Sequence, residues 1–181
     1  MVDRAKLTAL GLQRGRVELR AHHNAWARAF QKECKRLVEA VGTDGYFVEH
    51  IGSTSVAGLP SKPILDIALR VRHPELLQEL KRHLSSIGYL YRGNNTENGG
   101  HLFVLEKSPE VRAIHLHAIF DSDPQWSDYL QFRDILRSNA DLRGKYADLK
   151  SHLATAFPGD RKKYTAGKAS FIKAALSGKS H

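Results

Sequence analysis

The chain has 181 residues, enough for one domain with its own hydrophobic core, and its single cysteine, Cys34, excludes a disulfide within the chain. Its first 25 residues contain no apolar core of a signal peptide and no later stretch reaches membrane-spanning length, so we expect a cytoplasmic protein with no membrane partner. The net charge of +9 suits an anionic partner. Because acidic residues alternate with the basic ones and no nucleic-acid-binding motif is present, nucleic acid is the less favoured partner. The sequence does not indicate an oligomeric state.

Along the first half of the chain, apolar spacing predicts a helix over 24–41, with Asn24 as N-cap and Gly42 just beyond the end. Strands are predicted over 46–51 and 64–71, the second rich in branched apolar residues. Pro74 begins a helix that ends before Gly88, and a short strand over 89–92 follows it.

The second half opens with a polar loop over 93–100 and continues with a hairpin of strands over 101–107 and 111–120. Asp123 and Pro124 begin a helix, and two more helices are predicted over 141–157 and 160–176. This order predicts an α/β (α+β) fold, a mixed β-sheet covered by helices with a helical C-terminal region. We expect one domain over 24–178, preceded by an N-terminal extension over 1–23.

The segment 49–66 combines residues that suit phosphate binding. Gly52 would let a phosphate approach the backbone, and Lys62 would add a positive charge. Asp66 lies in an otherwise apolar strand, where a carboxylate needs a partner. The alternative is an ordinary turn with an Asp66–Lys62 salt bridge. We call residues 52–55 the Gly-Ser corner; its hydroxyls belong to Ser53, Thr54 and Ser55.

Four stretches of the chain carry a family resemblance: HIGSTSVAGLPSKPILDI (50–67), HLHA (115–118), the helix over 131–150 and RKKYTAGKASFI (161–172). In these stretches the chain resembles the GrpB family of the nucleotidyltransferase superfamily. This resemblance implies a nucleotidyltransferase-like fold, a phosphate site at Gly52 and Ser53 with Lys62 on the phosphates, and Asp66 as the ligand of a divalent ion, Mg or Mn. The pattern breaks at Ala68, where the resemblance places a second acid, and a two-metal mechanism needs several carboxylates.

Two histidines offer a different metal site. His115 and His117 are two residues apart on a predicted strand, so both rings face the same side and can reach one ion with Asp66, and His50 can join them. Such a set suits Zn, Fe, Mn or Ni. The alternative is that these histidines are core or hydrogen-bonding residues, because the chain has ten histidines and chance pairs are common.

Further basic residues lie in stretches that resemble the family, but the sequence does not define their role. Arg112 is assigned to the phosphate site, whereas Arg133 and Lys150 fit anion binding and an exposed helix surface equally well. Tyr164 and Lys168, one helical turn apart, are similarly ambiguous.

Three functions remain open from the sequence. The first is transfer of a nucleotidyl or phosphoryl group, with Asp66 and Lys62 as catalytic residues and a nucleotide or other phosphorylated small molecule as partner. The second is a non-catalytic binding module for a nucleotide or coenzyme A-type ligand, since some family members resemble an appendage fused to dephospho-coenzyme A kinase. A metal-dependent enzyme that uses the His-His-Asp set is the third.

Overall fold

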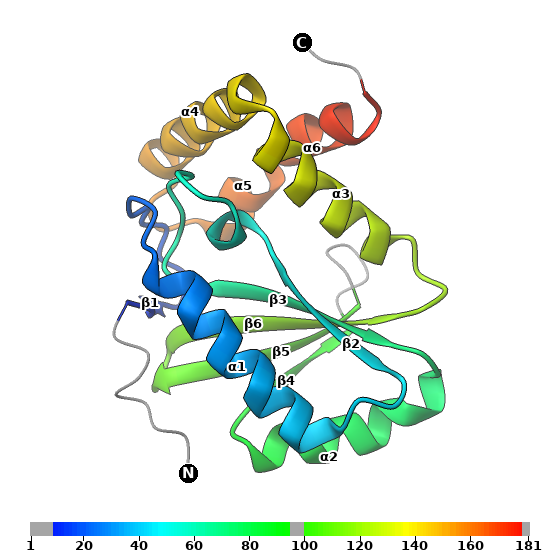
Figure 1. The fold of residues 1–181 in the computed structure, drawn as a ribbon. Coiled ribbons are helices and arrows are strands. Elements are labelled where there is room, and N and C mark those ends of the chain that lie inside the picture. Colours follow the sequence, from blue (N-terminus) through cyan, green and yellow to red (C-terminus); the bar gives the residue numbers. More distant parts are fainter. Residues whose placement is uncertain (1–8, 95–99, 179–181) are drawn as a thin grey trace.

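The computed structural model describes residues 9–94 and 100–178. Residues 1–8 of the predicted extension and 95–99 of the predicted loop lie outside the described residues. One mixed sheet organises the molecule, with strands β2 (Tyr46–Ile51), β3 (Leu65–Val71), β6 (Val111–Phe120), β5 (His101–Ser108) and β4 (Leu90–Asn94) in that spatial order. β3 and β6 are parallel, and the other neighbours along this path are antiparallel. Figure 1 shows this sheet between two groups of helices.

Helices α1 (Ala25–Val41) and α2 (Leu77–Ser86) cover one face of the sheet. The main core lies here, where Trp26 and Leu37 of α1 and Leu84 of α2 pack with Ile67 and Leu69 of β3. All five side chains are at most 1 % exposed, and complete burial of a side chain such as Leu stabilises the fold by roughly 1.5–3 kcal/mol. In both helices, apolar residues three or four positions apart form one side of the helix, and this side is buried against the sheet.

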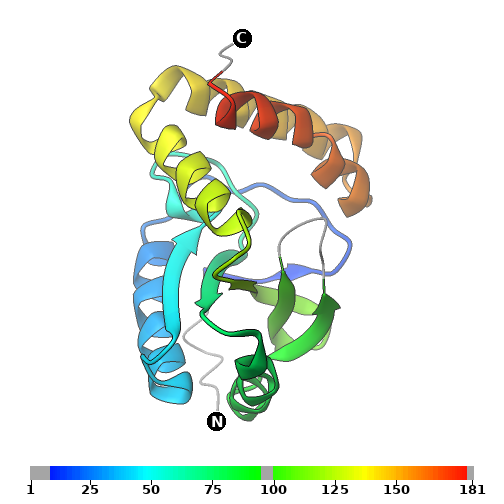
Figure 2. The same cartoon turned by 90° about the vertical axis from the view of Figure 1, so that its right-hand side faces the viewer.

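The opposite face carries α3 (Gln125–Ser138), whose Trp126 and Leu130 pack on Ala68 and Ile119. The remaining helices, α4 (Ala140–Ala156), α5 (Arg161–Ala166) and α6 (Ala169–Leu176), gather with α3 in a separate group (Figures 1 and 2). Their core includes Val56 and Leu59 from the segment after β2, so it joins the C-terminal helices to the Gly-Ser corner. The predicted α/β class, mixed sheet and helical C-terminal region are confirmed.

The helices and strands differ from the prediction at a few places. The helix predicted over 160–176 is wrong as a single element, because α5 ends at Ala166 and α6 begins at Ala169. A 3-10 turn, Pro74–Leu76, precedes α2, and the strand predicted over 89–92 is β4. The hairpin of β5 and β6 and the strand over 46–51 are confirmed. No helix among the described residues is long and apolar enough to span a membrane.

The described part of the N-terminal extension is attached to the sheet. β1 (Leu12–Gln13) pairs with β6, and the buried side chains of Leu10 and Leu12 cover apolar surface. The amide of Gly11 also donates a 2.8 Å hydrogen bond to the carbonyl of Pro63, just before β3. Sequence patterning missed β1 because a strand of two residues has no period to detect.

Candidate functional site

The Gly-Ser corner bends the chain directly above Asp66. Gly52 follows β2 with φ 67° and ψ −174°, a combination that essentially only glycine adopts. A Cβ atom there would lie 2.7 Å from Oδ2 of Asp66, so glycine is also required by the close approach of the two residues. Residues Ser53–Ser55 then form one 3-10 turn. The structure thus brings together the two ends of the segment that the sequence singled out.

The predicted hydroxyls of the corner face different partners. Ser55 Oγ donates to the carbonyl of Gly52 at 2.6 Å, and buried Thr54 shares a 3.0 Å hydrogen bond with Nε2 of His50. The ring of His50 also stacks on Phe30, with the ring centroids 4.6 Å apart. Ser53 is the hydroxyl that faces the C-terminal helices, and His50 is held by Thr54 and Phe30.

Asp66 is joined by both predicted histidines. The parallel register places Asp66 opposite His115 and Ala68 opposite His117, so the three polar side chains share one face of the sheet. Oδ1 of Asp66 lies 3.2 Å from Nδ1 of His115 and 3.9 Å from Nε2 of His117. The salt bridge from Asp66 to Lys62, offered as the ordinary alternative, is wrong, because Asp66 pairs with the imidazoles of β6 instead.

Burial and hydrogen bonding act in opposite directions on this group. Burial raises the pKa of Asp66, but hydrogen bonds with His115 and His117 outweigh it and hold the pKa well below its usual value. Burial lowers the pKa of His115 to about 4 despite its contact with Asp66, so the ring is neutral at pH 7. Nε2 of His115 and Nδ1 of His117 are buried without a hydrogen-bond partner.

These donors do not fit a two-ion site. Ala68 is fully buried at the position where the family resemblance places the second acid, and it offers no ligand atom. Within residues 9–94 and 100–178, no group of three or more His, Cys, Asp or Glu side chains is placed to hold a metal ion. Asp66 therefore faces two imidazoles of β6 and, in the described part of the chain, no second carboxylate that would complete a metal site.

Four cationic side chains gather beside the Gly-Ser corner and Asp66, and we call them the basic cluster: Lys62, Lys150, Arg161 and Lys168. Lys150 of α4 is 1 % exposed, and its Nζ donates to Ser53 Oγ at 3.1 Å and to the carbonyl of Pro60. Nζ of Lys62 and of Lys168 lie 5.3 and 4.8 Å from the ring centroid of Tyr164. Across the part of the chain that the structure describes, none of the four forms an ion pair with a carboxylate.

Their pKa values show how costly this arrangement is. Burial, followed by repulsion from Arg161 and Lys168, lowers the pKa of Lys62 to about 7. Burial and the charges of Lys168 and Lys62 likewise lower the pKa of Lys150 to about 7. The pKa values of Lys168 and Arg161 are lowered in the same way, mainly by burial, although Asp66 opposes the change in both. The cluster is a concentration of positive charge that one carboxylate does not neutralise.

The sequence missed most of this cluster. Lys150 and Lys168 were ambiguous and Arg161 was not singled out, although it and Lys168 belong to the matched stretch 161–172 and Lys150 ends the matched helix over 131–150. Arg112 of β6 pairs with Leu12 of β1. It is 7 % exposed, and its pKa is lowered by burial and by Arg161. Arg133 has a structural contact, because its guanidinium donates to Glu49 Oε2 at 2.7 Å and to the carbonyl of His50 at 3.1 Å.

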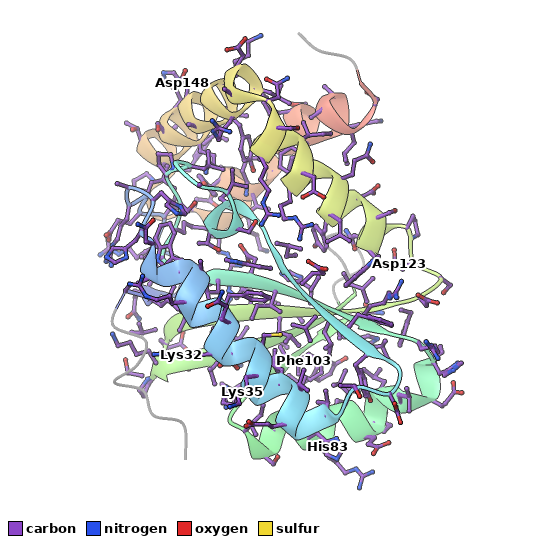
Figure 3. The ribbon with its side chains drawn as sticks, viewed as in Figure 1. Lys32, Lys35, His83, Phe103, Asp123 and Asp148 are labelled. Carbon is purple, nitrogen blue, oxygen red and sulfur yellow. The ribbon has the colours of Figure 1, made fainter. Side chains whose placement is uncertain are left out.

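Other charges lie away from the site. Lys32 and Lys35 are exposed along α1, on the side of the sheet that carries the main core (Figure 3). Asp148 precedes Lys150 by two residues but is exposed on the outer side of α4 (Figure 3). The neighbouring acid on α4 therefore does not neutralise the basic cluster.

Comparison with known proteins places the chain among bacterial relatives. A family model described as GrpB protein matches residues 16–177. The UPF0157 protein YqkA of Bacillus subtilis is 32 % identical over 160 residues, which are 88 % of this chain and 46 % of that protein. A UPF0157 protein of Pseudomonas aeruginosa is 36 % identical over 155 residues, 84 % of this chain and 63 % of that protein. The chain thus spans between about half and two thirds of these two relatives.

Among solved structures, the crystal structure of the conserved protein GrpB from Enterococcus faecalis superposes with a TM-score of 0.79. The two sequences are 32 % identical, and the match covers 90 % of this chain and 96 % of that one. Strands β2 to β6, the corner and the C-terminal helices all lie within the residues matched by the family model, whereas β1 precedes them.

Proposed function

The chain belongs to the GrpB protein family, and from this premise we propose that it binds a phosphorylated small molecule, a nucleotide or a similar compound, between the Gly-Ser corner and the basic cluster. One observation carries the proposal: four buried or half-buried cations, with no ion-pair partner in the described part of the chain, gather beside a glycine turn and Asp66. Phosphate oxygens are strong acceptors for such groups.

The energetics of the cluster support an anionic ligand. Burial disfavours the charged form of a lysine, which is why the pKa values of Lys62 and Lys150 fall to about 7. A bound phosphate would return favourable charge interactions to the same side chains and raise these pKa values again. Binding would therefore relieve an unfavourable arrangement that the folded chain otherwise maintains.

Transfer of a nucleotidyl or phosphoryl group is the reaction that the family resemblance implies for this site. Phosphoryl transfer depends mainly on positioning and on stabilising the charge of the phosphate oxygens. Ser53, Lys150 and Lys62 would position the phosphates, and Gly52 would admit them close to Asp66. The family resemblance also implies a divalent ion, Mg or Mn, at Asp66 for this reaction, but the residues do not supply the carboxylates of a two-ion site, and the binding proposed here does not depend on an ion.

Ligand-induced thermal stabilisation tests the binding. We expect nucleoside triphosphates or coenzyme A to raise the melting temperature, since a ligand at about 100 times its Kd adds about 2.7 kcal/mol to the stability of the folded state. Lys62→Gln should reduce the shift, whereas Lys162→Gln, which changes an exposed lysine of α5 outside the cluster, should leave it unchanged. Analysis of nucleotide products after incubation then separates a transferase from a binding module. Absence of a shift with every phosphorylated compound would contradict the proposal.

A second candidate function rests on the two imidazoles beside Asp66. His115 and His117 each bring a ring nitrogen within 4 Å of the same carboxylate oxygen, so a small rearrangement would place all three on one transition-metal ion. We expect protein purified without chelator to contain stoichiometric Zn, Fe, Mn or Ni if this candidate is right. If elemental analysis finds less than about 0.1 equivalent of these metals per chain, this second candidate function is ruled out.

A further inference from the structure

Asp66 is the feature from which the charge of the ligand can be inferred. Its side chain is 33 % exposed, and Oδ1 is already occupied by the contacts with His115 and His117. The neighbouring position on the same face of β3 is Ala68, which is fully buried and apolar. The corner therefore offers few free oxygen ligands, which are what magnesium prefers.

The positive charge around Asp66 comes from the protein instead. Lys62 and Lys168 both lie near the ring of Tyr164, Lys150 contacts Ser53, and Arg161 lowers the pKa of both Lys62 and Lys168. At full protonation these four side chains carry four positive charges against the one negative charge of Asp66. A buried excess of this size is unfavourable unless a multiply charged anion compensates it.

We infer that the protein binds its ligand as a free polyanion with at least two phosphate groups, and that the basic cluster supplies the positive charge that divalent ions supply at carboxylate-rich phosphoryl-transfer sites. This inference rests on the proposed function and specifies the charge state of the ligand. A magnesium ion bound to a polyphosphate cancels two of its negative charges, so the complexed ligand matches the cluster less well than the free one.

The two sides of the cluster indicate why one phosphate is not enough. Lys150 lies at the Gly-Ser corner through Ser53, whereas Lys62 and Lys168 are grouped around Tyr164 of α5. A chain of phosphates can contact both groups at once, but a single phosphate compensates only part of the charge. We therefore expect tripolyphosphate to bind more tightly than AMP.

Calorimetric titration at matched ionic strength tests the inference. Inorganic tripolyphosphate, ATP and AMP are titrated into the full chain in EDTA, and the first two again with MgCl₂ in excess over the ligand. We expect tripolyphosphate and ATP to bind in EDTA, and magnesium to weaken both by about tenfold, because it reduces the charge that the cluster attracts. Lys168→Gln should weaken binding in EDTA by a similar factor, while Lys162→Gln should not change it.

The possible outcomes separate this inference from the proposed function. Tighter binding with magnesium, or equal binding of AMP and tripolyphosphate, would overturn the inference and leave the proposed phosphate site standing. If no phosphorylated compound binds in either condition, both fail. Equal affinities for the wild type and a folded Lys168→Gln variant would assign the binding to another surface and also overturn the inference. The magnesium comparison on the wild type does not depend on how the variant folds.

Discussion

Individual lysines in this protein behave according to their surroundings rather than their sequence neighbours. Lys150 is nearly inaccessible and donates to Ser53 and Pro60, whereas exposed Lys162 lies outside the cluster on the same group of helices. Burial is the main cause of the lowered pKa of Lys62 and Lys150, and mutual repulsion is the second. At this site the fold removes water from basic residues and, among the residues that the structure describes, leaves them without an ion-pair partner, which is why we propose them as ligand-binding groups.

The stability of the free protein should consequently rise with pH above neutrality. Lys62 and Lys150 have pKa values of about 7 in the folded protein against an ordinary 10.5, so between these limits the folded state binds fewer protons than the unfolded state. The free energy of unfolding should increase between pH 7 and 9.5, by up to about 3 kcal/mol for each of the two lysines. Over the same window the stabilisation by a phosphate ligand should decrease, because the lysines lose their charge.

Urea unfolding at a series of pH values, with and without tripolyphosphate, measures both trends. Lys150→Met removes one of the two titrating groups and should flatten the rise for the free protein, with Lys162→Met as the matched control. A free energy of unfolding that stays level or falls between pH 7 and 9.5 would show that these lysines keep ordinary pKa values.

At the scale of elements, the Gly-Ser corner depends on Gly52 more than on Gly58, the next glycine in the sequence. Gly52 and Gly58 both have positive φ, 67° and 77°. A Cβ atom on Gly52 would meet Asp66, whereas one on Gly58 would meet nothing within 4 Å. The two positions thus share a backbone requirement, and only the first also contacts the candidate site.

This difference makes a matched pair of substitutions informative. Gly58→Ala should cost about 1 kcal/mol or somewhat more through backbone strain and should keep the ligand-induced rise in melting temperature. Gly52→Ala should be more destabilising and should abolish that rise, because the new methyl group displaces Asp66 or the corner. Equal loss of stability and equal ligand response in the two variants would contradict the role given to Gly52.

The break between α5 and α6 shows how packing overrides a local pattern. The apolar spacing over 160–176 suits one helix, and the side chain of Asp160 caps its start by accepting from the amide of Lys163 at 3.0 Å. A Cβ atom on Gly167 would lie 2.5 Å from Cδ2 of Leu153, so a larger residue there would require the end of the Leu153 side chain to move. The sequence contains this glycine but does not show which helix lies against it.

At the scale of the whole molecule, the charge of +9 is divided between different surfaces. Lys32 and Lys35 are exposed on α1, while the basic cluster lies between the C-terminal helices and the Gly-Ser corner. The composition suggested an anionic partner but did not show which basic residues would contact it. The sheet separates the lysines of α1 from the basic cluster, and the candidate site lies at the basic cluster.

The sequence by itself determined the order of most helices and strands, the mixed sheet and the segment 49–66 as candidate site. These features follow from apolar periodicity and turn residues, which are local properties of the chain. The pairing of Asp66 with His115 was inferable only in part. The spacing of His115 and His117 predicts that they share one face of their strand, but it does not predict that the strand of Asp66 lies beside it. The tertiary structure supplied the register that joins them.

Only the tertiary structure decided which cations gather beside the Gly-Ser corner. Ser53 and Lys150 are 97 positions apart in the chain yet share a hydrogen bond, and Lys62 and Lys168 approach the same tyrosine ring from different elements. No local pattern encodes such contacts, because they arise when the core formed by Val56, Leu59 and the C-terminal helices closes over the corner. Local patterns of the sequence therefore located the corner, and long-range packing brought the basic cluster to it.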